Sequence, residues 1–183
     1  MCNRFVISQF DPKDNNTSSV VFYAVEKLGV KDSTFQAQYS VRLCTLTDTW
    51  SIVVIVGHSE CGGATACLTS VQNTENIGSI AEGSLATMLP DPEHGITAAS
   101  PLNRCLEPLT RHVATLQLKG EKNPLQKVVE ENVKFQVKRL AESDMMKHAW
   151  GPSKKKVKIH GWVYDLASGK LKDLGVSVPA SAD

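Results

Sequence analysis

The residues best suited to chemistry in this chain lie in the segment 57–63, Gly-His-Ser-Glu-Cys-Gly-Gly. In a tight turn between a strand and a helix, His58 and Cys61 can bring an imidazole nitrogen and a thiolate to one tetrahedral Zn²⁺. The dipole of a following helix favours the thiolate form of Cys61. Gly62 and Gly63 allow a ligand to approach the backbone closely. The motif alone leaves a second interpretation open, a buried thiol and a hydrogen-bonded histidine beside a glycine turn.

The elements around this segment can be predicted from the pattern of apolar residues. Residues 51–57 are a β-branched run that ends in glycine, which is typical of a strand buried on both faces of a parallel sheet. Residues 64–71 follow as a helix, and residues 73–101 read as a long loop. Strands alternating with helices predict an α/β fold with a mainly parallel sheet flanked by helices. The other expected elements are a helix at 20–28 that the hydroxyl residues 17–19 can cap, a helix with an apolar stripe at 102–116, and a helix that Asn123 caps and Pro124 opens. A hairpin of strands is expected at 157–166 and 170–174.

Length and charge restrict the function further. The 183 residues fit a single domain, 1–183, and 20 Lys and Arg against 19 Asp and Glu leave a net charge of +1. A nucleic acid or an anionic membrane is therefore not expected as a partner. The longest apolar stretch, residues 52–56, is too short to span a bilayer, no signal peptide is visible, and five cysteines do not make a disulfide framework. We expect a cytoplasmic protein, with a mitochondrial location open if a longer N-terminus exists.

Residues 52–63 closely resemble the second zinc motif of the β-class carbonic anhydrases, particularly the fungal ones. Residues 24–30, 129–133 and 160–169 are similar to other parts of that family. The resemblance implies a β-carbonic-anhydrase-like fold, a Zn²⁺ cofactor, reversible hydration of CO2 to bicarbonate, and a homodimer or higher oligomer. It also implies that His58 and Cys61 are metal ligands and that the backbone of Gly62 borders the substrate pocket.

Two departures from the family pattern matter for activity. The family takes its other cysteine ligand and an Asp–Arg dyad from a Cys-x-Asp-x-Arg motif, and these 183 residues contain no such motif. We therefore expect an N-terminally truncated form of the fold and assign no catalytic residue. Residues 32–50 have no counterpart in the family pattern, and the alternation of residues 39–44 predicts a strand within this apparent insertion. A strand there would make Cys44 a candidate for the missing ligand.

Three functions follow as hypotheses. The first is a zinc-dependent carbonic anhydrase whose activity is impaired, with weak zinc binding because only two ligands are secured. The second is a catalytically inactive paralogue that acts as a partner subunit. The third is a thiol enzyme with Cys61 as the nucleophile and His58 as its base. The remaining histidines, and Cys67 and Cys105, are expected to have structural roles.

Overall fold

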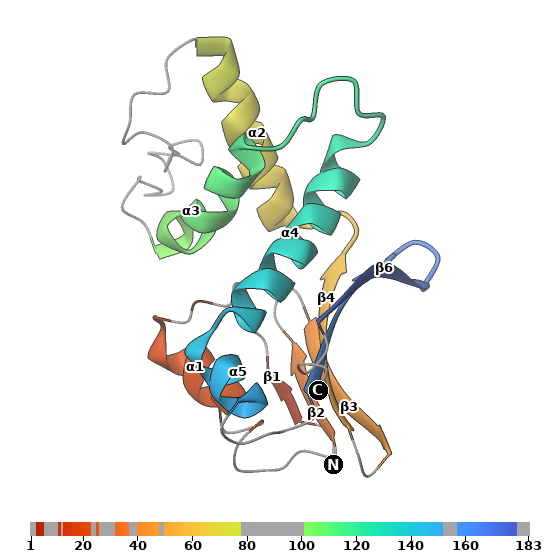
Figure 1. Cartoon of the computed structure of the whole chain (residues 1–183). Coiled ribbons are helices and arrows are strands. Elements are labelled where there is room, and N and C mark those ends of the chain that lie inside the picture. Colours follow the sequence, from red (N-terminus) through yellow and green to blue (C-terminus); the bar gives the residue numbers. More distant parts are fainter. Residues whose placement is uncertain are drawn as a thin grey trace. The chain divides into compact units, whose positions relative to one another are not determined.

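The computed structural model describes residues 3–5, 11, 13–22, 25, 32–36, 40–47, 50–77, 101–151 and 157–178. The chain forms two compact units, residues 1–59 with 133–183, and residues 60–132. Strands and helices are labelled in Figure 1. The strands are β1 (Asn3–Phe5), β2 (Asp32–Gln36), β3 (Ser40–Thr47), β4 (Trp50–His58), β5 (Val157–Tyr164) and β6 (Leu171–Val178), and the helices are α1 (Asn15–Phe22), α2 (Gly62–Ile77), α3 (Pro101–Ala114), α4 (Pro124–Ala141) and α5 (Asp144–Trp150).

The first unit is built on a six-stranded sheet with the order β1-β2-β3-β4-β5-β6. Within it β1 is parallel to β2 and β4 is parallel to β5, while the other three pairings are antiparallel. The α/β fold class is confirmed, but the sheet is mixed rather than mainly parallel. The reason is the length of the connections: only short links join β2 to β3, β3 to β4 and β5 to β6, and such links allow hairpins but no parallel crossover.

Strand β4 has the burial that its sequence predicts. Val53, Val54 and Ile55 are consecutive, so their side chains point to both faces of the sheet, and none is more than 3% exposed. The neighbouring strand β5 alternates instead, with Val157, Ile159, Gly161 and Val163 buried and the residues between them less buried. The strand that leads to the candidate site is therefore the buried centre of this sheet, as in other α/β folds.

The second half of α4 packs on β5 at Gly161. A Cβ atom added at this glycine would lie 2.9 Å from Val133 Cγ1 and 3.2 Å from Val137 Cγ2, and 2.6 Å from Val176 Cγ2 on β6. A register shift between β5 and β6 falls at Gly161 and Trp162, which is typical of a glycine within a strand. The absence of a side chain at this position is what lets the helix approach the sheet.

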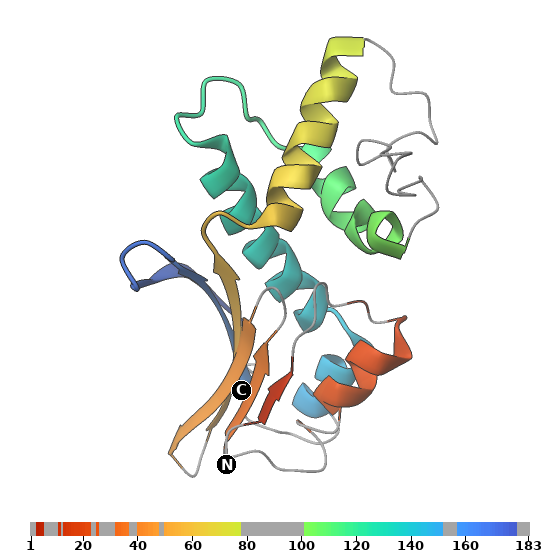
Figure 2. The ribbon, with the colours of Figure 1, turned by 180° about the vertical axis from the view of Figure 1, so that it is seen from behind.

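The short helix α1 also belongs to the first unit, where it lies beside α5 in both views (Figures 1 and 2). It begins at Asn15, and the Ser18 N–H donates to the Asp14 carbonyl. The sequence predicted a helix over 20–28 with the hydroxyl residues at 17–19 as its cap, so this start was placed too late. Hydroxyl residues can also continue a helix once an earlier residue has started it. Beyond residue 22 only Val25 of that prediction lies within the described residues.

The second unit contains α2, α3 and the first part of α4. The predicted apolar stripe of α3 is buried, with Leu106, Leu109 and Val113 at most 4% exposed. Asn123 caps α4 as predicted, because its Oδ1 accepts a hydrogen bond of 3.1 Å from the Gln126 N–H. The loop predicted over 73–101 is wrong at its start, because α2 continues to Ile77. Residues 78–100 of that prediction lie outside the described residues. None of the described helices combines the length and the apolar character needed to cross a membrane.

Candidate metal-binding turn

The candidate site follows the end of β4 directly. Because β4 and β5 are parallel, their carboxyl ends lie at the same edge of the sheet, with His58 paired to Tyr164 in the register. Ligands of open α/β sheets bind outside the carboxyl ends of the strands. The fold therefore places His58 where this class of protein binds its ligands.

The ring of His58 is oriented by a backbone group. Its Nδ1 lies 2.8 Å from the carbonyl oxygen of Ser59. A carbonyl oxygen can only accept a hydrogen bond, so Nδ1 carries the proton and the Nε2 lone pair is the one suited to a metal. Metal-binding histidines typically donate their other ring N–H to a carbonyl or carboxylate in this way, which fixes the tautomer and the ring.

Ser59 joins this turn to the end of β5. Its N–H donates to the Tyr164 carbonyl at 2.9 Å. Its Oγ accepts a hydrogen bond of 2.9 Å from the Leu166 N–H. No pattern in the sequence marks Ser59 as important, since a serine in a turn is common and its partners lie more than a hundred positions away in the chain.

The next residue, Glu60, has a left-handed backbone conformation with φ of 57°. Among the described residues no other non-glycine has a positive φ. This conformation typically costs a residue with a Cβ atom about 1 kcal/mol or more. Local strain of this kind clusters at functional turns, and the sequence gave no signal for it because glutamate is rare in this region of backbone space.

Cys61 belongs to the second unit and lies immediately before α2, which begins at Gly62. Cys61 is 2% exposed and is not part of a disulfide. The Cys61 carbonyl accepts hydrogen bonds from the Thr65 N–H at 2.9 Å and the Thr65 hydroxyl at 3.1 Å. This places Cys61 at the helix N-terminus, as the sequence predicted. Deep burial of the thiol does not favour the thiol-enzyme hypothesis, which needs Cys61 to reach a substrate.

The two glycines after Cys61 differ in their surroundings. A Cβ atom added at Gly62 would meet nothing within 4 Å, whereas one at Gly63 would lie 3.4 Å from Leu106 Cδ2 and 3.9 Å from the Cys61 Sγ. Gly63 therefore packs within the second unit, and Gly62, which is exposed, leaves open space. That space is compatible with a ligand beside Gly62, which stays a prediction.

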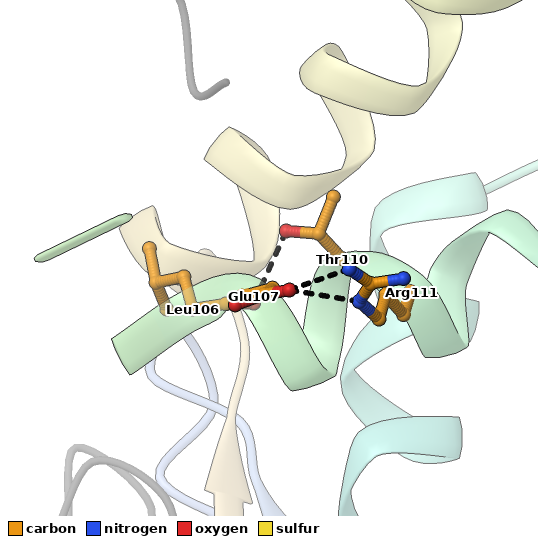
Figure 3. Close-up of polar contacts among 4 residues, drawn as sticks. All are labelled: Leu106, Glu107, Thr110 and Arg111. Atoms are coloured by element: carbon orange, nitrogen blue, oxygen red, sulfur yellow. Dashed lines mark hydrogen bonds and ion pairs between the residues drawn. The ribbon is translucent and has the colours of Figure 1, made fainter. Parts of the chain in front are cut away.

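Cys67 has the structural role expected for it. Burial raises the pKa of its thiol to about 11, although a hydrogen bond from the Thr110 hydroxyl, 3.3 Å from the Cys67 Sγ, opposes this. The same hydroxyl lies 3.1 Å from the Leu106 carbonyl, within its own helix. Figure 3 shows this contact beside the exposed ion pair of Glu107 and Arg111. Cys67 is thus a protonated core residue between α2 and α3.

Among the described residues, neither the remaining histidines nor Cys105 belongs to a group of three or more side chains that could hold a metal ion. On the β5–β6 hairpin, the Nδ1 atom of His160 lies 2.8 Å from the Ser177 hydroxyl. His112 lies on α3, and burial lowers its pKa. His148 is exposed on α5, Cys105 is half-buried, and His94 lies outside the described residues.

Cys44 is not placed to complete a metal site with His58. Strand β3 runs antiparallel to β4, and Cys44 pairs with Ile52, near the start of β4, whereas His58 is its last residue. At about 3.3 Å per residue, this register separates the two by about 20 Å along the strand. The prediction of Cys44 as the replacement ligand is therefore wrong. That role would require β3 to run parallel to β4, so that residue 44 lies toward the carboxyl end of β4.

The described residues do not provide a complete zinc centre. They contain no group of three or more His, Cys, Asp or Glu side chains that could hold a metal ion. A structural or catalytic zinc site normally uses at least three protein ligands. His58 has the hydrogen bond that is typical of a metal ligand, and Cys61 is a cysteine outside any disulfide. Residues 58–61 therefore supply donors of the correct type but too few of them.

Comparison with known proteins identifies the family. The family model for carbonic anhydrase matches residues 38–171, and the chain belongs to this family. The match begins inside the segment 32–50, so part of the apparent insertion falls within the family alignment.

Solved structures assign the fold to the β class. The chain is similar to a β-carbonic anhydrase from Coccomyxa in complex with acetazolamide, with a TM-score of 0.60 and 22% identity over 93% of this chain and 58% of that one. It is similar to the β-carbonic anhydrase CafA of the fungus Aspergillus fumigatus, with a TM-score of 0.53 and 24% identity over 96% and 61%. It is also similar to a tetrameric β-carbonic anhydrase from Sordaria macrospora, with a TM-score of 0.52 and 21% identity over 94% of this chain and 65% of that one. The chain thus spans about three-fifths of the length of these proteins.

Proposed function

We propose that this chain takes part in the reversible hydration of CO2 to bicarbonate, with His58 and Cys61 as two protein ligands of a Zn²⁺ ion. Membership of the carbonic anhydrase family and the β-class fold support this activity. The observation that carries the assignment of the ligands is the 2.8 Å contact between His58 Nδ1 and the Ser59 carbonyl. It orients an imidazole at the carboxyl end of a buried parallel strand, immediately before a cysteine at a helix N-terminus.

We also propose that these 183 residues by themselves bind zinc weakly and hydrate CO2 slowly. The described residues supply two donors, and the sequence has no Cys-x-Asp-x-Arg motif to supply a third ligand and the dyad beside it. Loss of groups that orient a metal site typically costs about 10–100-fold in affinity or activity, and loss of a ligand costs more.

A partner subunit without activity of its own is the second candidate. The incomplete donor set of the described residues favours it, because such a chain could keep the fold without the reaction. The similar protein from Sordaria macrospora is a tetramer, and a homodimer or higher oligomer is the assembly we propose here. The partner would be a second copy or an intact paralogue.

Zinc content and CO2 hydration, measured together, test both proposals. We expect less than one equivalent of zinc after dialysis against a chelator, and slow hydration in a stopped-flow assay. His58→Ala and Cys61→Ser should remove the zinc that remains, whereas His148→Ala, which changes an exposed histidine on α5, should not. A repaired variant, extended at its N-terminus with a Cys-x-Asp-x-Arg strand, should gain at least about tenfold in zinc affinity.

The results separate the candidates. A full equivalent of zinc after chelation, with hydration as fast as in the repaired variant, would refute the proposal that this chain binds zinc weakly and hydrates CO2 slowly. Zinc binding that persists in His58→Ala would refute the assignment of the ligands. Slow hydration by the chain alone, together with hydration by an intact paralogue that rises above its own rate when the chain is added, would favour the partner subunit.

A further inference from the structure

Ser59 uses three of its polar groups in three different contacts. The carbonyl accepts the Nδ1–H of His58 at 2.8 Å. The N–H donates to the Tyr164 carbonyl at 2.9 Å, and the Oγ accepts from the Leu166 N–H at 2.9 Å. The first contact orients the histidine, and the other two attach the same residue to the chain segment that leaves β5. All of these groups belong to the first unit.

The segment that receives Ser59 is a closed turn. The Asp165 N–H donates to the Lys170 carbonyl at 2.8 Å, and the Gly169 N–H donates to the Asp165 carbonyl at 2.9 Å. The Oδ1 of Asp165 accepts from the Ser168 N–H at 2.8 Å. Gly169 has a φ of +69°, which a residue with a Cβ atom rarely adopts. The Leu166 N–H is therefore presented to Ser59 by a turn with its own internal hydrogen bonds.

We propose that Ser59 is a positioning residue for the metal ligand His58 and that it acts by fixing the carbonyl of Ser59 against the turn after β5. Without the hydroxyl, the Leu166 N–H loses its partner and one of the two attachments of Ser59 to this turn is lost. The carbonyl of Ser59 then moves more freely, and the preference of His58 for the Nδ1–H tautomer weakens. This inference rests on the proposed function only where it concerns zinc, because the tautomer is a property of the metal-free protein.

Two readouts test the proposal on the full 183-residue chain. The tautomer of His58 can be read from long-range ¹H–¹⁵N NMR spectra of the metal-free protein at pH 8. Zinc affinity can be measured by competition with a chelating dye. We expect Ser59→Ala to reduce the share of the Nδ1–H tautomer and to weaken zinc binding by about tenfold, the lower end of the range for groups that orient a ligand. Ser59→Thr keeps a hydroxyl and should keep both properties.

Two further variants separate positioning from a general loss of structure. Ser177→Ala removes another hydroxyl that contacts a histidine, His160, and should leave the tautomer of His58 and the zinc affinity unchanged. Asp165→Ala removes the acceptor for the Ser168 N–H within the turn. Asp165→Ala should weaken zinc binding less when it is added to Ser59→Ala than when it is made in the wild-type chain, because the turn acts on His58 through Ser59.

The proposal is overturned if Ser59→Ala, shown to be folded by its thermal transition, keeps the wild-type tautomer. It is also overturned if Ser177→Ala produces the same change as Ser59→Ala, or if the tautomer shifts while zinc affinity stays the same. If the wild-type chain binds no zinc, the proposed function fails, and the tautomer comparison alone decides the role of Ser59.

Discussion

Replacing Gly161 by alanine should lower the free energy of unfolding by about 2 kcal/mol, because the added methyl group has no room. Its Cβ would lie 2.6 Å from Val176 Cγ2, 2.9 Å from Val133 Cγ1 and 3.2 Å from Val137 Cγ2. Carbon atoms in favourable contact are about 3.5–4.0 Å apart, so the first two methyl groups must move by more than about 0.5 Å.

The neighbours of Gly161 cannot move that far without a cost. All three are valines, whose side chains have little freedom at χ1, so relief requires movement of α4 or β6. Overpacking of this kind costs about 1–3 kcal/mol, and alanine recovers about 0.5–1 kcal/mol through the lower entropy of the unfolded chain. With a steric cost at the upper end of the overpacking range, about 3 kcal/mol, the net loss in the free energy of unfolding is about 2 kcal/mol. For a chain of this size the melting temperature should fall by about 4–8 °C.

Urea unfolding followed by circular dichroism measures the effect. Gly62→Ala is the matched control, since a Cβ atom there meets nothing within 4 Å, and its stability should be unchanged or slightly higher. The double variant Gly161→Ala with Val133→Ala should be less destabilised than the sum of the two single variants by about 1 kcal/mol, because the smaller residue relieves the clash. Gly161→Ala with wild-type stability, or strict additivity in the double variant, would refute the reasoning.

Three other predictions concern single residues. Glu60→Gly should raise the free energy of unfolding by about 0.5–1 kcal/mol in urea unfolding, because it relieves the left-handed backbone at φ of 57°; a loss of stability would contradict this. Thr110→Val should lower the free energy of unfolding by about 1 kcal/mol, since it removes a buried hydroxyl that contacts Cys67 and Leu106, and no change in the urea midpoint would refute it. Burial lowers the pKa of His112, so the imidazole binds a proton more readily in the unfolded chain than in the folded one. The stabilisation of the fold by neutral His112 is therefore complete above about pH 6.5 and is lost as the pH falls. Melting temperatures between pH 7.5 and 5.5 should therefore fall less in His112→Gln than in the wild type, and equal slopes would exclude the effect.

The sequence by itself determined the parts of this protein that depend on local pattern. The unbroken β-branched run before Gly57 predicted the buried strand β4, and Asn123 followed by Pro124 predicted the start of α4. The His-Ser-Glu-Cys segment predicted a turn between a strand and a helix. These predictions succeeded because hydrophobic periodicity and helix capping involve residues that are close in the chain.

Only the tertiary structure decided which strands pair, in which direction and at which register. The antiparallel pairing of β3 with β4 places Cys44 beside Ile52. This register excluded Cys44 as the missing zinc ligand, a possibility that the sequence alone left open. The contact between Ser59 and Leu166 and the register of β4 with β5 depend on segments far apart in the chain. Strand pairing is set by packing between such segments and by the turns that join them, so a one-dimensional pattern can name the residues with the chemistry of a metal site, but the fold decides which of them meet.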